Sequence, residues 1–283
     1  MHMDANELLK GDISIASLPD IYSRLEEAID APDTSFEHIG ALISSDPALA
    51  ARMLRLANSA LFKTRNPVDS IYTAVSVIGT KQLRDLVLAT IVIDKFDGID
   101  QDRLNMEDFW RHSIACGIAA RVIATYQREP NVERYYLMGL FHDMGRILLL
   151  SKIPDEETAV LIKADQQDCL LQPLEQEMLG FDHADISAQL LKMWNLPEIQ
   201  QEAVHYHHAP QEAPNENAAA SLVHVADWIA HGLNYGTSGE KYVPPLDEAA
   251  WEALHIPTSA LDTIIKHIDE QYQSTVNLFL KGH

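Results

Sequence analysis

The chain has 283 residues, 47% hydrophobic and 22% charged, which is the composition of a globular protein with enough apolar mass for one large core or two smaller ones. Its 42 acidic residues against 21 lysines and arginines give a formal net charge of -21, which argues against binding to duplex nucleic acid or an anionic membrane surface. The only cysteines, Cys116 and Cys169, are far apart and outside any C-x-x-C pair, so neither a disulfide framework nor a thiolate zinc site is indicated. No signal pattern opens the chain, and its longest apolar stretch is far shorter than the roughly 20 residues of a membrane span, so we expect a cytoplasmic protein.

Helical periodicity and helix-start signals predict about five short helices in the N-terminal part of the chain. The first begins at Leu18–Asp20, where the proline suits a first turn. Ser35 is the expected cap of the second helix, and Asp46 opens the third. Ser70 and Thr80 are the expected caps of two more.

A polar, acidic stretch over 94–105 interrupts this periodic packing and predicts a linker between two lobes. Strand-like alternation is essentially absent, so the sequence predicts an all-α protein. We expect an N-terminal helical lobe over 1–98, a lobe carrying a metal site over 99–235, and a C-terminal helical extension over 236–283. Beyond the linker, helices are predicted over 106–126, 132–152, 158–167, 173–179, 183–194, 197–208 and 217–234, followed by two terminal helices, the last over 259–279.

The first candidate site residue, His112, lies on an apolar helical stripe, and Asp108 precedes it by one turn on the same side. A carboxylate and an imidazole at this spacing can meet one ion. The alternative is a core histidine that is hydrogen-bonded to the aspartate.

The second candidate is the His142-Asp143 dipeptide, set inside an apolar segment that also contains Gly139 and Gly145. A buried carboxylate needs a cation, an arginine or several donors, and a metal would satisfy Asp143 with His142 as co-ligand. Asp227 is a second acid on an apolar helical stripe, and two inward acids favour a shared cation.

Further imidazoles come from His183, at the start of a predicted helix, and from the cluster 205–208. Not every histidine needs a role in a chain with 13 of them. Four other histidines are interpreted as surface or structural residues: His224, His231, His255 and His267.

The order His112, His142-Asp143 and Asp227 on separate helices resembles the ligand set of the HD superfamily of metal-dependent phosphohydrolases. More closely, the chain is similar to the HDOD family, the HD-related output domains of bacterial signalling proteins, from about Leu18 to His231. The segments that carry this resemblance are Ser45–Leu49, Leu54–Ala60, Phe109–Ser113, Gly139–Gly145, Gly180–Ala184 and Tyr206–His208.

The resemblance implies an N-terminal helical lobe packed against a multi-helical, HD-domain-like lobe. By similarity to the related HD-GYP phosphodiesterases, Asp108 is expected to be an additional metal-binding acid. The same similarity implies that three histidines complete a multi-metal site: His183, His207 and His208.

The chain departs from the HD-GYP pattern at three places. Arg146 stands where that motif has a lysine, Ala209 stands where a glutamate follows the paired histidines, and the loop 210–217 has no Gly-Tyr-Pro element. We therefore do not expect hydrolysis of cyclic-di-GMP.

Two functions follow from these observations, and the sequence leaves open whether the protein is an enzyme. The favoured one is a regulatory signalling module with an HD-type metal site, which receives its input from a signalling protein partner or a small phosphorylated ligand. The alternative is a metal-dependent phosphohydrolase acting on a nucleotide or other phosphate ester, with Asp143 and Arg146 as catalytic residues and Arg146 contacting the phosphate. Mixed imidazole and carboxylate sites accept iron, manganese, zinc or nickel, and the residue set has room for one or two ions. No oligomeric state is predicted.

Overall fold

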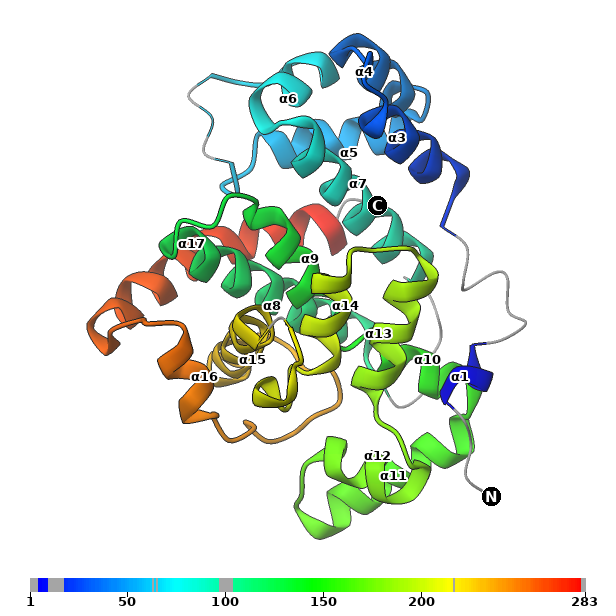
Figure 1. Ribbon diagram of the computed structural model, residues 1–283, viewed down its shortest axis with the longest axis vertical. Coiled ribbons are helices and arrows are strands. Elements are labelled where there is room, and N and C mark those ends of the chain that lie inside the picture. The colour runs from blue at the N-terminus through cyan, green and yellow to red at the C-terminus, as the bar shows by residue number, and fades with distance from the viewer. Residues whose placement is uncertain are drawn as a thin grey trace. The chain divides into compact units, whose positions relative to one another are not determined.

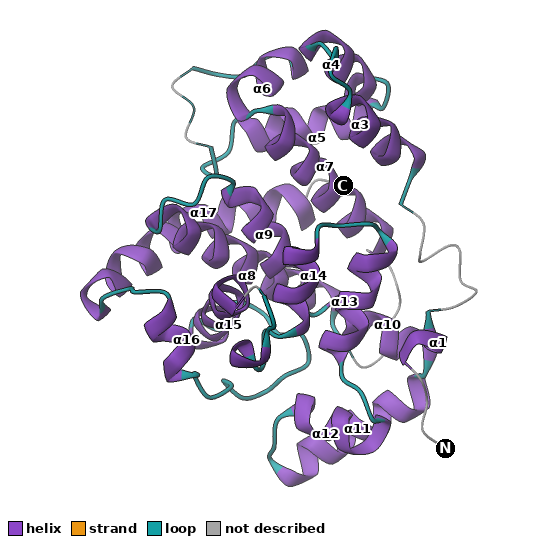
Figure 2. Ribbon diagram, viewed as in Figure 1, coloured by secondary structure: helices purple, strands orange, loops and turns teal. Residues whose placement is uncertain are grey.

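The computed structural model describes residues 5–9, 18–62, 64, 66–96, 104–215 and 217–280. Every regular element among these residues is helical, which confirms the predicted all-α class (Figure 2). None of the described helices is both long and apolar enough to pass through a bilayer. The contacts within the chain divide it into two compact units, a larger one of Met1–Ser17 with Gly98–Ile265 and a smaller one of Leu18–Asp97 with Lys266–His283.

The smaller unit contains the five N-terminal helices that the sequence predicted (Figure 1). Within it, α4 contacts its three neighbours α3, α5 and α6, and α7 also contacts α3, α5 and α6. The bounds of these helices are α3 Asp20–Asp30, α4 Phe36–Ser44, α5 Pro47–Ala57, α6 Ile71–Ile78 and α7 Thr80–Phe96.

Side-chain caps fix where three of these helices begin. Ser35, Asp46 and Ser70 each accept hydrogen bonds from backbone N–H groups of the first turn that follows, as predicted. Thr80 is instead the first residue of α7, because Gly79 ends α6 immediately before it with a φ of 95°. The predicted capping role of Thr80 was therefore wrong.

The larger unit is built around α8, which packs against α9 and α15, while α13 packs against α10 and α14. These helices supply the side chains of the candidate site. The elements of this unit are α1 Ala5–Leu8, α8 Met106–Tyr126, α9 Val132–Phe141, α10 Met144–Lys152, α11 Pro154–Gln167, α12 Leu171–Leu179, α13 His183–Met193, α14 Glu198–His205, η1 Pro210–Glu212, α15 Asn217–Gly232, α16 Glu248–Ala253 and η2 Thr258–Ala260, followed by the start of α17 Leu261–Leu280.

The prediction of one helix over 132–152 was wrong, because α9 ends at Phe141 and α10 begins at Met144. Apolar periodicity runs through the break and hides it from the sequence. Two glycines flank the break and allow other backbone segments to approach closely. A Cβ on Gly139 would lie 2.6 Å from the carbonyl oxygen of Cys116, and one on Gly145 would collide with the carbonyl oxygen of His183.

The predicted linker lies only partly within the described residues, since α7 continues to Phe96 and 97–103 are outside them. The segment 236–283, expected as a C-terminal extension, is shared between the units. Residues 236–265 group with the larger unit, and 266–283 group with the smaller one.

Candidate metal centre

The structure brings together the four residues that were expected to share an ion. His112 comes from α8 and Asp227 from α15, and His142 and Asp143 form the break between α9 and α10. All four are buried, with exposed fractions of 0% for both histidines, 3% for Asp143 and 4% for Asp227. His112 Nε2 lies 3.0 Å from Asp227 Oδ1, and His142 Nε2 lies 3.2 Å from Asp143 Oδ2 and 3.4 Å from Asp227 Oδ1.

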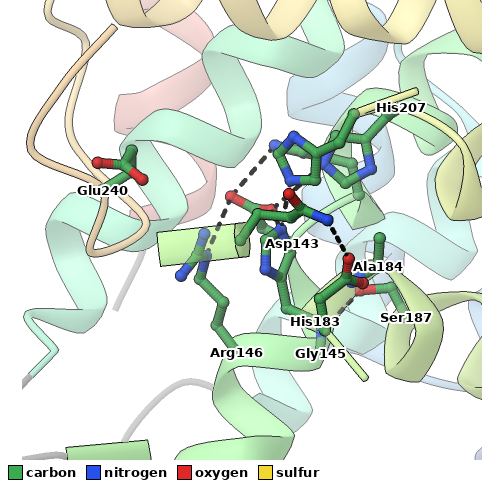
Figure 3. A network of polar contacts seen from close by, with 12 residues as sticks. Asp143, Gly145, Arg146, His183, Ala184, Ser187, His207 and Glu240 are labelled. Atoms are coloured by element: carbon green, nitrogen blue, oxygen red, sulfur yellow. Dashed lines mark hydrogen bonds and ion pairs between the residues drawn. The ribbon is translucent and has the colours of Figure 1, made fainter. Parts of the chain in front are cut away.

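A second group of donors forms around the other oxygen of Asp143. Asp143 Oδ1 lies 3.0 Å from His183 Nε2 and 3.8 Å from His207 Nε2, and Figure 3 shows Asp143 beside both histidines. His208 Nε2 lies 2.8 Å from His183 Nε2, and the donor atoms of these four residues are all within 4.8 Å of one another. Asp143 thus presents one carboxylate oxygen to each group, the arrangement of a shared ligand.

Hydrogen bonds fix the tautomers of three of these histidines. His142 and His207 each donate from Nδ1 to a backbone carbonyl, at 2.8 and 2.6 Å. His183 donates from Nδ1 to Glu175 Oε2 at 2.5 Å. Because a carbonyl or carboxylate oxygen can only accept, Nδ1 carries a hydrogen, and in the neutral, metal-binding form of each ring the Nε2 lone pair faces the cluster.

Several buried atoms in the cluster lie close together without the geometry of a hydrogen bond: Nε2 of His112, His142 and His207, and Oδ1 of Asp227. A buried polar atom without a partner is costly, so a native protein normally pairs it. Imidazole nitrogens and carboxylate oxygens that face one another in this way fit a divalent transition metal.

The two buried acids of the cluster also require positive charge nearby. Burial works to raise the pKa of Asp143, but His142 and His183 outweigh burial and hold that pKa well below its ordinary value. Burial also works to raise the pKa of Asp227, yet its histidine neighbours, led by His231, hold it well below the ordinary value. Both acids are therefore charged at neutral pH and surrounded by imidazoles.

The imidazoles divide into protonated and neutral ones. Burial and Arg146 work to lower the pKa of His183, but Glu175 and Asp143 raise it to about 10. Burial, together with His142, lowers the pKa of His207 to about 3. Without a metal, protons such as that on His183 supply the positive charge that the two acids require, and a bound ion would displace them.

His231 was interpreted as surface or structural, but it belongs to the cluster. Its Nε2 lies 3.4 Å from Asp227 Oδ1, and its ring centroid lies 4.5 Å from that of His112. The sequence contained a signal for it, since His231 follows Asp227 by four residues on α15 and so shares its helix face. Cys116, one turn after His112, is a further buried neighbour that groups with His142 and Asp227.

Asp108 does not join the other donors. It lies in the first turn of α8, half-buried, and its carboxylate is in none of the potential metal-binding groups among the described residues. Four residues of helix separate it from His112, a rise of about 6 Å along the axis. Its backbone carbonyl accepts a hydrogen bond from Thr237 N at 3.1 Å.

Arg146 is buried among carboxylates. It is 3% exposed, and its Nη1 donates to Glu175 Oε1 at 3.1 Å. Its Nε lies 3.8 Å from Asp143 Oδ2 (Figure 3). Arg146 also lines a cavity of about 200 Å³ that borders the cluster. The other residues around this cavity include Asp143, Asp227, His208, His231, Gln172 and Glu240.

The model of one family, the HDOD domain, matches residues 15–210. The chain belongs to the HDOD family. This confirms the resemblance seen in the sequence, and the match includes all of the cluster except the two α15 residues, Asp227 and His231.

Two solved structures resemble this HDOD protein along nearly its whole length. An HDOD domain protein with unknown function from Geobacter sulfurreducens is 26% identical, with 98% of this chain and 97% of that chain covered and a TM-score of 0.80. A candidate phosphohydrolase from Shewanella amazonensis SB2B is 24% identical, with 98% and 99% covered and a TM-score of 0.74, and this likeness shows the fold.

A curated relative, an uncharacterized protein from Treponema pallidum (strain Nichols), is 29% identical over 205 residues. The match covers 71% of this chain and 39% of the relative. The HDOD chain thus spans about two fifths of the length of that relative.

Proposed function

We propose that this HDOD protein is a regulatory signalling module whose larger unit binds two divalent metal ions at neighbouring positions. The observation that carries the proposal is the convergence of buried imidazole nitrogens and carboxylate oxygens in groups whose donor atoms lie within 4.8 Å of one another, several of them without a hydrogen-bond partner. The first position would be held by His112, His142, Asp143 and Asp227. The second would be held by Asp143, His183, His207 and His208. Iron, manganese, zinc and nickel all suit this donor set.

A regulatory role follows from where the ligands come from. They are carried by α8, the break between α9 and α10, α13, the turn after α14, and α15. Ions at the two positions would join these helices and stabilise the larger unit, because any ligand that binds only the folded state shifts the folding equilibrium. Metal occupancy would then govern how rigidly the unit presents its surface to a signalling partner.

The cavity beside the cluster supports a second candidate, a metal-dependent phosphohydrolase. It reaches Asp143, Asp227, His208 and His231, so a phosphate group inside it would lie next to both metal positions. A bound ion would polarise a phosphoryl oxygen and lower the pKa of its water to about 7. The remaining polar groups at the cavity would orient the ester.

Two features favour regulation over hydrolysis. Drug-sized ligands occupy pockets of roughly 300–1,000 Å³, whereas this cavity measures about 200 Å³, which suits a phosphate group better than a whole cyclic dinucleotide. Arg146, the predicted phosphate contact, is already paired with Glu175.

Elemental analysis of protein purified without added metal, and again after reconstitution with Mn²⁺ or Fe²⁺, tests the metal site. We expect two ions per chain after reconstitution. A timed screen of phosphate esters and cyclic dinucleotides then separates the two functions, with Asp143→Ala as the control for contaminating phosphatase. We expect feeble, unselective turnover and none with cyclic-di-GMP. Failure to bind any of these ions would contradict the proposal, and robust Asp143-dependent cleavage of a cyclic dinucleotide would make the hydrolase primary.

A further inference from the structure

Glu175 is a fully buried acid on α12 that the sequence did not single out. Its exposed fraction is 0%, and both of its oxygens are used. Oε2 accepts the backbone N–H of His183 at 2.9 Å and lies 2.5 Å from His183 Nδ1. Oε1 accepts from Arg146 Nη1 at 3.1 Å. One carboxylate therefore holds both the backbone and the ring of His183.

The partner of His183 differs from those of the two other histidines whose tautomers are fixed. His142 and His207 donate from Nδ1 to neutral backbone carbonyls. His183 donates to a carboxylate, and hydrogen bonds to charged acceptors are shorter and stronger than those to neutral ones. A carboxylate behind a ligating imidazole also increases the basicity of the opposite nitrogen. Nε2 of His183 should consequently be the strongest imidazole donor of these three.

His183 Nε2 faces the donors of the second metal position, so a change in its basicity should act there. His183 Nε2 lies 3.0 Å from Asp143 Oδ1 and 2.8 Å from His208 Nε2. The potential metal-binding groups at the first position, around His112 and Asp227, do not include His183. A change at Glu175 should therefore act on one position and leave the other nearly unchanged.

Arg146 has a supporting role in this chain of contacts. It is 3% exposed and pairs with Glu175 at 3.1 Å, while its Nε lies 3.8 Å from Asp143 Oδ2. A buried guanidinium in this place offsets the charge of Glu175 and holds its carboxylate toward His183. This contact explains the cation at position 146 without a substrate.

We infer that Glu175, held by Arg146, is a positioning residue that sets the affinity of the second metal position through His183. The inference rests on the proposed two-ion site and adds a residue that touches neither ion. It predicts a selective effect, since outer partners of metal ligands typically change metal affinity by about 10–100-fold.

The test is a calorimetric Mn²⁺ titration of the Glu175→Gln variant, with elemental analysis of the loaded protein. We expect the first ion to bind as in the parent and the second to bind about 10–100-fold more weakly. Glu177→Gln is the matched control, because Glu177 lies on the same helix but is exposed and paired with Lys163. It should bind both ions as the parent does. Proton NMR adds a readout of positioning, since the low-field Nδ1–H signal of His183 should move upfield only in Glu175→Gln.

The single variant leaves Arg146 buried without its carboxylate, which can prevent folding. If the single variant does not fold, the double variant Glu175→Gln with Arg146→Met, which removes both charges, is titrated instead. It should fold and still weaken the second ion more than the first, although the loss of Arg146 near Asp143 Oδ2 also changes the charge beside the first position. Unchanged binding of both ions, or equal weakening of both, would overturn the role of Glu175. If the parent itself binds no Mn²⁺, the two-ion site fails, whereas a parent with two ions and an unaffected variant contradicts only the role of Glu175.

Discussion

The two compact units differ in what their helices bury. In the smaller unit, side-chain caps start α4, α5 and α6, and few charged groups are buried, Arg52 and Asp85 among them. In the larger unit, helices far apart in the chain bring histidines and acids to one buried cluster, and all the potential metal-binding groups of the described residues lie there. The smaller unit can be explained from local signals, whereas the larger one is stabilised only if its buried charges are matched.

The largest expected effect comes from Asp143→Ala. Asp143 faces both groups of donors, so its removal should abolish binding at both metal positions. In the metal-free protein it also leaves the protonated His183 without a principal counter-charge, and breaking a buried ion pair typically costs about 3–5 kcal/mol. Elemental analysis and urea unfolding, each with and without Mn²⁺, measure the two effects.

Asp155→Ala is the matched control, since Asp155 is exposed in the first turn of α11. It should unfold and bind metal as the parent does. Asp143→Asn should be milder than Asp143→Ala in the metal-free protein, because it keeps the shape and one acceptor. Equal metal content in Asp143→Ala and the parent would show that the cluster is not the metal site.

Metal addition should stabilise the larger unit and leave the stability of the smaller unit nearly unchanged. An ion present at 100 times its dissociation constant stabilises the state that binds it by about 2.7 kcal/mol. Hydrogen exchange should therefore slow at the amides of α8, α9 and α15, which surround the ligands, with little change in α4, α5 and α6. Mass spectrometry of hydrogen exchange with and without Mn²⁺ checks this. Equal protection of both units would contradict the prediction that metal stabilises only the larger one.

The metal-free protein should be most stable near pH 6.5. The raised pKa of His183, about 10, stabilises the fold below the ordinary imidazole value of about 6.5, and this contribution is lost as the pH rises toward 10. The lowered pKa of His207, about 3, acts in the opposite sense, and its contribution is lost as the pH falls from 6.5 toward 3. Each group changes the unfolding free energy by about 1.4 kcal/mol per pH unit in its window.

Thermal melts from pH 4 to pH 9 measure this profile. Mn²⁺ should move the maximum to higher pH, because the ion displaces the proton of His183 and binds more tightly as that proton leaves. A metal-free profile that rises steadily from pH 6.5 to pH 9 would contradict the assigned charges.

The smallest expected effect belongs to the smaller unit. Asp46 accepts hydrogen bonds from the backbone N–H groups of Ala48 and Leu49, and loss of such a cap typically costs about 1 kcal/mol. Asp46→Ala should lower the unfolding free energy by this amount, and the loss should be the same with and without Mn²⁺. Asp33, which is exposed in the turn between α3 and α4, changed to Ala, is the control. A cap effect that depends on metal would show that the units are coupled.

Much of this protein followed from its sequence. Helical periodicity with Ser35, Asp46 and Ser70 gave the N-terminal helices and their starts, because capping depends on residues within one turn. The same patterns singled out His112, Asp143 and Asp227, since a carboxylate on an apolar stripe must find a partner.

Tertiary structure decided the rest. Spacing along a helix says which face a residue occupies but not how far it reaches toward another helix, which is why Asp108 was included and His231 was left out. The break at His142 and Asp143 depends on the close backbone approach at Gly139 and Gly145, which contacts between distant segments create. Glu175 could be recognised only once α12 had been placed beside His183 and Arg146, because an acid on a helix gives no local sign of the charges that folding brings to it.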